Sequence, residues 1–142
     1  MNSDQTSKLG TPGTLDTHVL LVEHDADIAW EIVDFLGRRG ISCRTCATAA
    51  QASAAFAERR PDVVVLNAAV SAGNSVVFCL TQATTFPDVH WLLLDAGERL
   101  ARLRHRALGD RVCIVHRPVS LRFVHDFVLA MGAIRRPAVA RG

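Results

Sequence analysis

Short apolar runs alternate with segments of helical periodicity, and this alternation constrains the fold more than any other feature of the chain. The apolar runs occupy residues 18–23, 41–47, 62–67, 89–94 and 112–115, and the spacing of apolar residues predicts helices over residues 28–36, 49–60, 75–84, 98–108 and 121–131. Runs that are apolar on both sides are typical of strands in a parallel sheet with helices on both faces. We therefore expect an α/β fold in which five parallel strands form one doubly wound sheet.

Residues with capping or helix-breaking roles mark the helix ends. Thr48 and Gln51 have the spacing of a capping box, which predicts a helix start beside Thr48. Gly40 is placed to stop the first helix, and Pro61 breaks the second. Ser120 is a favourable N-cap for the last helix.

The length of 142 residues suits one domain with its own core. We assign residues 17–132 to this domain, residues 1–16 to a disordered N-terminal tail and residues 133–142 to a C-terminal tail or linker. The first segment lacks the apolar stretch of a secretory signal, and no apolar run is long enough to cross a bilayer. We expect a cytoplasmic protein with no membrane association and with reduced cysteines.

Cys43 and Cys46 form a C-x-x-C motif inside a predicted strand. Strand residues three apart point to opposite faces of a sheet, so the two thiols are poorly placed to share a metal ion. No second pair with the spacing of zinc ligands follows in the sequence. We therefore expect no metal site and no cofactor.

Charge is distributed unevenly along the chain. Residues 1–97 carry 6 basic and 11 acidic side chains, whereas residues 98–142 carry 10 arginines and 3 acids. This asymmetry is compatible with a surface for an acidic partner or for nucleic acid, and equally with a solvated arginine-rich face.

Polar side chains stand at the ends of four predicted strands. They are Glu23 with His24, Asn67, Asp95 and Arg117. Ligands of doubly wound sheets bind outside the carboxyl ends of the strands. Topology alone therefore predicts a candidate site formed by these residues.

The chain contains the segments VLLVEHDADI at residues 19–28, RPDVVVL at residues 60–66 and RPVS at residues 117–120. In this order they resemble the receiver domain of bacterial two-component response regulators. The first segment resembles the opening strand and acidic turn of that family. The second resembles the segment before the phosphoacceptor, and the third resembles the Lys-Pro-x-Ser turn. The resemblance covers about residues 17–132 and implies the CheY-like fold, a flavodoxin-like (βα)5 sandwich, with a cis bond before Pro118.

By the same resemblance, four of the five positions of the family's phosphorylation site carry side chains that do not suit phosphorylation. Glu23 matches the first of two acids that hold a divalent cation, but His24 stands at the second. Asn67 replaces the acceptor aspartate, Asp95 replaces a Ser or Thr that binds the phosphoryl group, and Arg117 replaces the lysine. These departures indicate a degenerate pseudo-receiver that keeps the fold and is not phosphorylated.

Simpler interpretations of the same residues remain open at this point. His24 is compatible with an ordinary solvated loop residue, and Asn67 with the mere end of a strand. Asp95 fits a turn or helix cap as well as an ion pair with Arg117.

The last two predicted helices suggest a contact surface. Phe123 and Phe127 form a second apolar stripe beside the one formed by Leu121, Val124, Val128 and Met131. Together the two stripes are wider than one buried helix face needs. A helix buried deeply in the domain's own core would explain them too. Arginines share a face of the preceding helix, at Arg99, Arg102 and Arg106. The resemblance implies pairing through these helices, either with a second copy or with another protein.

Three functions remain open, and the first is preferred. It is a phosphorylation-independent interaction module in bacterial signalling or transcription control. The second is the regulatory part of a longer DNA-binding response regulator, and nucleic acid would be a partner in that case alone. The third is a small enzyme or ligand binder, but the sequence has neither a glycine-rich phosphate loop nor a nucleophile–base pair. We therefore expect no enzymatic activity.

Overall fold

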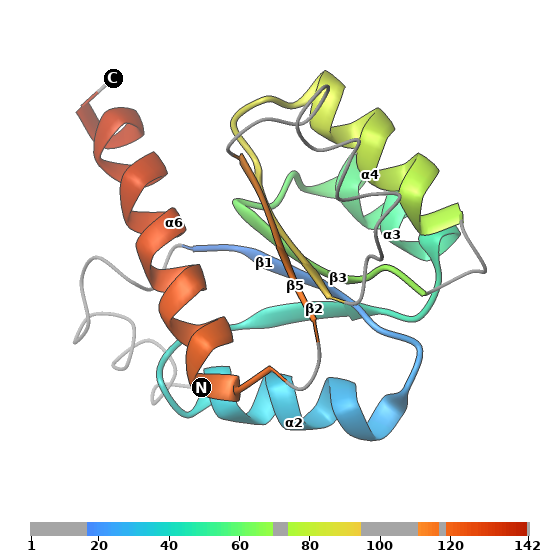
Figure 1. The fold of residues 1–142 in the computed structure, drawn as a ribbon. Coiled ribbons are helices and arrows are strands. Elements are labelled where there is room, and N and C mark those ends of the chain that lie inside the picture. The colour runs from blue at the N-terminus through green and yellow to red at the C-terminus, as the bar shows by residue number, and fades with distance from the viewer. Residues whose placement is uncertain (1–16, 70–73, 95–110, 117–118, 142) are drawn as a thin grey trace.

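The computed structural model describes residues 17–69, 74–94, 111–116 and 119–141 (Figure 1). The order of elements is β1 (Val19–Val22), α2 (Ala26–Gly37), β2 (Cys43–Cys46), α3 (Ala49–Glu58), β3 (Val63–Asn67), α4 (Asn74–Thr85), β4 (His90–Leu94), β5 (Val112–Val115) and α6 (Leu121–Arg141). The helix expected over residues 98–108 lies outside the described residues.

The five strands form one parallel sheet in the order β2-β1-β3-β4-β5. In Figure 1, α3 and α4 cover one face of the sheet, and α2 and α6 cover the other. This order confirms the predicted flavodoxin-like, doubly wound sandwich. The point at which the strand order reverses lies between β1 and β3, where such sheets form their sites.

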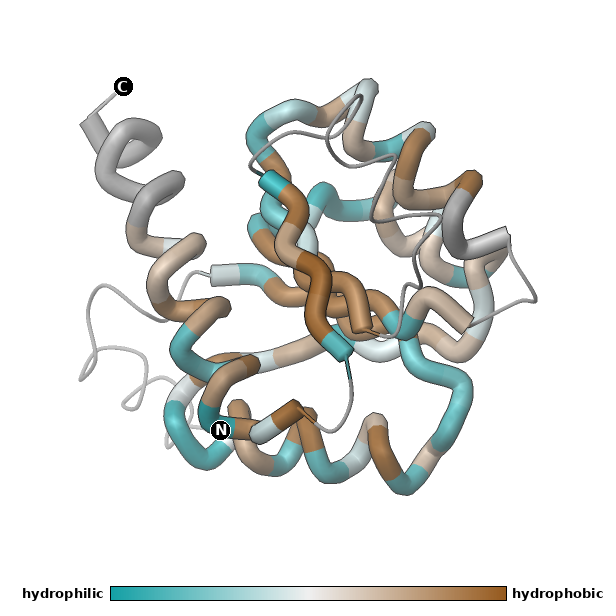
Figure 2. Tube along the Cα trace, viewed as in Figure 1, coloured by the Kyte–Doolittle hydropathy of each residue, from teal (hydrophilic) through white to brown (hydrophobic). Residues whose placement is uncertain are grey.

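Burial of the central strands on both faces explains their uniform composition. Every residue of β1 and β3 is buried, and the strands form the brown centre of Figure 2. On the α3 and α4 side, the Trp91 ring stacks on Phe56 with centroids 6.1 Å apart and meets the edge of Phe78 at 5.7 Å. Within the described residues the indole N–H of Trp91 has no hydrogen-bond acceptor. Burying this donor without a partner costs free energy, which offsets part of the stability gained from the aromatic packing.

The predicted caps are confirmed atom by atom. The Thr48 hydroxyl accepts from the Gln51 N–H at 3.1 Å, and the Ser120 hydroxyl accepts from the Phe123 N–H at 3.0 Å. Gly40 has φ of +85°, the left-handed conformation that favours glycine after a helix. Helix α3 ends at Glu58, slightly before the predicted end, because the residue before Pro61 is held away from helical angles.

The predicted end of the last helix was wrong. A stop near residue 131 was expected, yet α6 continues through Pro137 to Arg141. Alanine and arginine dominate this segment, and both have high helix propensity. No helix in the described part of the chain has the length and hydropathy that crossing a membrane requires.

Helix α6 approaches the start of β1 very closely at Gly132. A Cβ atom at that position would lie 2.6 Å from Oγ1 and 2.9 Å from Cγ2 of Thr17, which is itself buried. The contact holds the middle of α6 against the chain just before β1. Only glycine fits at this distance without a shift of Thr17.

We expect Gly132→Ala to lower the free energy of unfolding by about 1–3 kcal/mol through overpacking. The matched control is Gly37→Ala in the last turn of α2, where no atom lies within 4 Å of the added methyl. That control should raise stability by about 0.5–1 kcal/mol, since alanine favours the helix. Urea denaturation followed by circular dichroism measures both. Thr17→Ala combined with Gly132→Ala should recover most of the loss; a double variant as unstable as the single one would contradict the contact.

Candidate functional site

Glu23 and Asn67 lie side by side at the carboxyl ends of β1 and β3. Val22 is in register with Leu66, so the next residue of each strand projects at the same edge of the sheet. Both side chains are buried, with exposed fractions of 4% for Glu23 and 3% for Asn67. The structure therefore brings together two of the predicted site residues.

The amide of Asn67 donates to the carboxylate of Glu23. Its Nδ2 lies 3.2 Å from Oε1 and 3.1 Å from Oε2 of Glu23. The amide oxygen accepts from the Ala69 N–H at 2.9 Å, which fixes which end of the amide faces the carboxylate. Asn67 therefore links the end of β1 to the loop after β3. Its amide nitrogen donates to Glu23, and its amide oxygen accepts from Ala69.

One further donor and one ring nitrogen lie close to the Glu23 carboxylate. The Asp25 N–H donates to Oε2 at 3.1 Å, and Nδ1 of His24 lies 3.6 Å from the same oxygen. The His24 side chain is 57% exposed, so it forms the solvent side of this site. A buried carboxylate is costly unless it is hydrogen-bonded, and the Asn67 amide and the Asp25 N–H supply such hydrogen bonds. His24 is therefore an exposed loop residue, and its imidazole also lies beside the Glu23 carboxylate.

These residues do not fit a magnesium ion. Magnesium takes oxygen ligands at about 2.1 Å in octahedral geometry. Here the Asn67 N–H groups face both oxygens of Glu23, and the neighbouring His24 offers an imidazole nitrogen. The side chain of Asp25 is used elsewhere, as the N-cap of α2, where it accepts from Asp27 and Ile28. The Glu23 carboxylate is hydrogen-bonded to an amide and a backbone N–H in place of a cation.

Sequence reasoning missed the role of Asp25. An aspartate immediately before an apolar-periodic helix is a known N-cap signal, and Oδ1 of Asp25 is accordingly engaged at the start of α2. The remaining predicted site residues, Asp95 and Arg117, lie outside the described residues. So do Pro118 and the arginines at positions 99, 102 and 106. The proposed ion pair, the cis bond and the arginine-rich face therefore stay predictions.

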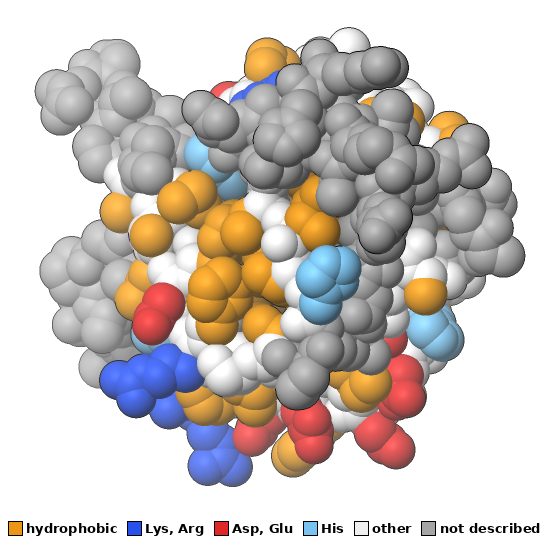
Figure 3. All heavy atoms as spheres, viewed as in Figure 1, with side chains coloured by type: hydrophobic (Ala, Val, Ile, Leu, Met, Phe, Trp, Pro, Cys, Tyr) orange, Lys and Arg blue, Asp and Glu red, His pale blue; other side chains and the backbone are white. Residues whose placement is uncertain are grey.

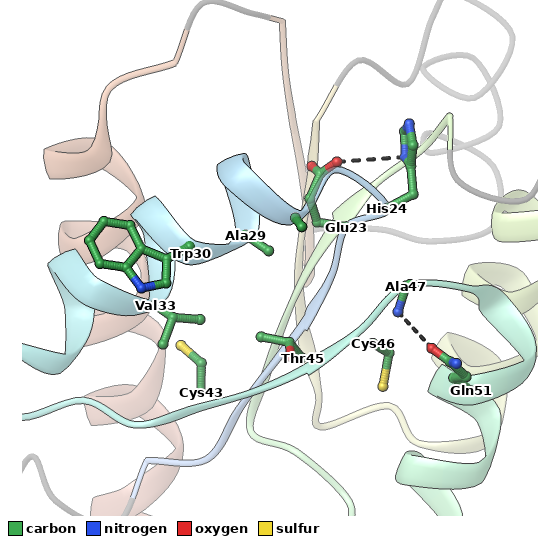
Figure 4. Close-up of a pocket in the computed structure, with 11 residues that line it drawn as sticks. Glu23, His24, Ala29, Trp30, Val33, Cys43, Thr45, Cys46, Ala47 and Gln51 are labelled. Atoms are coloured by element: carbon green, nitrogen blue, oxygen red, sulfur yellow. Dashed lines mark hydrogen bonds and ion pairs between the residues drawn. The ribbon is translucent and has the colours of Figure 1, made fainter.

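A groove opens beside the site, between α2 and β2 (Figure 4). Its volume is about 540 Å³, and it reaches from Glu23 and His24 along both elements. The lining from α2 and β2 includes Ala26, Ala29, Trp30, Val33, Cys43, Thr45 and Cys46. The groove is thus apolar along its length and polar at one end.

The two cysteines of the C-x-x-C motif point to opposite sides of the sheet, as predicted. Cys43 packs with the α2 and α6 side, and Cys46 packs with the α3 and α4 side. Burial raises the pKa of the Cys43 thiol to about 12 and also raises the pKa of Cys46. Both thiols are therefore protonated at neutral pH and poorly suited to nucleophilic or metal chemistry.

The two predicted interface phenylalanines of α6 differ in their surroundings. Phe123 is 40% exposed, whereas Phe127 is half-buried and packs against the core beside Val124 and Val128. Phe127 thus contributes to the domain's own core, and the free part of the second stripe is centred on Phe123.

Comparison with known proteins identifies the fold. No protein-family model matches the sequence. No curated protein matches it either. Among solved structures, a CheY-like receiver domain protein from Methanospirillum hungatei JF-1 matches with a TM-score of 0.76 at 14% identity, over 86% of this chain and 98% of that chain. The non-phosphorylated HemR receiver domain from Leptospira biflexa matches with a TM-score of 0.72 at 22% identity, over 86% of this chain and 98% of that one.

A longer protein contains the same fold. NtrX from Brucella abortus, solved in complex with ADP, matches with a TM-score of 0.67 at 19% identity, over 87% of this chain and 28% of that chain. Together with the sheet order and the buried strand-end pair, these likenesses show that this chain has the fold of a response regulator receiver domain.

The Glu23–Asn67 pair makes a sharp prediction about stability. Asn67→Asp should lower the free energy of unfolding by about 3 kcal/mol at neutral pH, because it places a second buried carboxylate against the first. Adding Glu23→Gln should recover most of this loss, since the pair again has one carboxylate and one amide donor. Urea denaturation of the two single variants, the double variant and the wild type gives the coupling energy. Strictly additive effects would contradict the pair.

Proposed function

We propose that this protein is a pseudo-receiver, a receiver domain that acts in bacterial two-component signalling without being phosphorylated. The observation that carries the proposal is the buried Asn67 amide hydrogen-bonded to Glu23. An amide nitrogen engaged with a carboxylate is not a nucleophile toward phosphorus. The residue at the acceptor position is therefore used to hold two strands together.

The pseudo-receiver carries out no catalytic step of its own. In a receiver that is phosphorylated, a cation offsets the charges of the acidic residues and the phosphoryl group. In this chain the pair of Glu23 and Asn67 has one negative charge, and neutral and backbone donors already surround it. The proposed output is a constant surface that binds another protein in the cytoplasm.

The proposed contact surface lies on α6 around Phe123. An aromatic side chain that is 40% exposed is well suited to the centre of a protein interface. The arginines at positions 99, 102 and 106 would form a charged rim if the preceding segment folds as its sequence predicts. Either a second copy or a different acidic protein would satisfy this surface.

The alternative function is the regulatory part of a longer DNA-binding response regulator. The likeness to NtrX favours it, since the matched part is 28% of that chain. Sequencing the coding region that follows codon 142 in the native gene tests this alternative directly. A downstream helix-turn-helix domain would support it, and a stop codon would exclude it.

Acetyl phosphate with magnesium should not label the wild-type protein. Asn67→Asp alone should also fail to give efficient labelling, because His24 and Asp95 remain unsuitable. Intact-protein mass spectrometry measures the adduct. An acid-stable, base-labile phosphoryl adduct on the wild type at one per chain would contradict the proposal.

The matched positive control restores all four altered positions in one chain. His24→Asp, Asn67→Asp, Asp95→Ser and Arg117→Lys together supply the residues that the family uses. We expect labelling of this variant if the fold itself supports the chemistry.

Phe123→Glu should abolish association while the fold is retained, because Phe123 is 40% exposed and contributes little to the core. Phe127→Glu is the matched control and should lower stability by about 2–4 kcal/mol, because this ring packs against the core. Light scattering and affinity capture measure association, and circular dichroism measures folding. A Phe123→Glu variant that associates as the wild type does would reject this surface.

A further inference from the structure

Strand β2 forms one edge of the sheet, next to β1. The Cys46 carbonyl accepts from the Glu23 N–H at 2.9 Å, so the backbone groups of Cys46 face inward. Backbone groups alternate in direction along a strand, and those of Cys43 and Thr45 therefore face outward. The next outward donor, the Ala47 N–H, is already bound by Gln51 Oε1 at 2.8 Å, which closes the free edge at that end.

The apolar groove runs directly beside this free edge. Figure 4 shows Ala29, Trp30 and Val33 projecting from α2 on one side of the groove, and Cys43 and Thr45 projecting from β2 on the other. A strand added along β2 would place every second side chain over the groove, since side chains alternate between the faces of a sheet. The groove volume of about 540 Å³ holds several such side chains.

Trp30 is the most exposed large apolar side chain of the described residues, at 65%. Asp27 and Glu31 lie three residues before it and one residue after it on the same helix, and both are exposed. Neither acid has an ion pair within the described residues, whereas the next acid, Asp34, is paired with Arg38 at 2.9 Å. Figure 3 shows carboxylates at the middle and right of the lower edge of the molecule, where α2 begins, and Lys and Arg side chains at the left of the same edge.

We propose that this edge binds an extended, arginine-bearing segment of a partner protein, which pairs with the backbone of Cys43 and Thr45 and lays its side chains in the α2–β2 groove. Free backbone groups select an extended chain. The unpaired acids select a positive charge, and an exposed tryptophan face attracts a guanidinium in particular. The proposal does not rest on the loss of phosphorylation. Glu23 and His24 lie at the polar end of the groove, but the proposed contacts are made by the backbone of Cys43 and Thr45, by Trp30 and by the acids of α2.

The short length of the free edge sets the strength of this binding. Only Cys43 and Thr45 offer outward backbone groups in β2, so few main-chain hydrogen bonds form. Specificity therefore comes from the groove and from the charge around Trp30. We expect weak, salt-sensitive binding of an isolated peptide.

The test uses a synthetic hexapeptide of alternating arginine and valine. The chain has two tryptophans, and Trp91 is fully buried, so a change in emission or in acrylamide quenching reports Trp30. Addition of the peptide should shift the emission to the blue and protect Trp30 from the quencher. Two control peptides should bind at least about fivefold more weakly. One has glutamate in place of arginine, and the other is N-methylated at every residue and so cannot donate backbone hydrogen bonds.

Variants of the protein separate the groove from the rest of the surface. Asp27→Asn should weaken the arginine peptide by about two- to fivefold, since Asp27 lies on the same face of α2 as Trp30. Asp126→Lys, an exposed charge reversal on α6, should leave its affinity unchanged. Trp30→Phe should keep the fold by circular dichroism and lose the fluorescence response, with residual binding measured by calorimetry.

Three outcomes would overturn the proposal. The first is no change at Trp30 at saturating peptide. The second is equal binding of the arginine peptide and either control peptide. The third is self-association of the wild type that Trp30→Ala removes in sedimentation, which would make a second copy the occupant.

Discussion

Burial of β1 and β3 on both faces is the constraint on which the rest of this structure depends. A strand with helices on both sides has no solvent-facing positions, so its residues must be apolar until the strand ends. Glu23 and Asn67 are the first polar side chains beyond that apolar stretch, and both remain buried. Both side chains are almost fully covered, so a charge at this point takes its hydrogen bonds from donors within the protein. The hydrogen bonds between the two side chains follow from this requirement.

The amide at position 67 gives the strand-end site a chemistry different from that of a phosphorylated receiver. A carboxylate there would need a cation between it and Glu23. The amide removes that need and holds β1 to the loop after β3 by direct hydrogen bonds. The site that usually changes state on phosphorylation is instead a fixed part of the core in the proposed function, and contact with partners falls to outer surfaces.

Two outer surfaces are distinguished by their physical character. Around Phe123 on α6 an aromatic ring is exposed beside a well-packed helix. Beside Trp30 on α2 an exposed ring is combined with unpaired acids, an apolar groove and a free strand edge. The first surface suits the flat contact of two folded domains. The second suits an extended segment, since it alone offers backbone hydrogen bonds.

The order of elements, the sheet and the helix caps were predictable from the sequence, because apolar periodicity and capping residues act locally. The substitution at position 67 was equally visible. The partner of Asn67 was not, because Glu23 is 44 residues away and the two meet only through the register of β1 with β3. The length of α6 escaped local rules, since its apolar stripe ends at Met131 whereas the helix continues to Arg141. The difference in burial between Phe123 and Phe127 was not predictable either, because helical periodicity shows which residues share a face but not how deeply each is buried. Tertiary packing alone decided which of these side chains is covered.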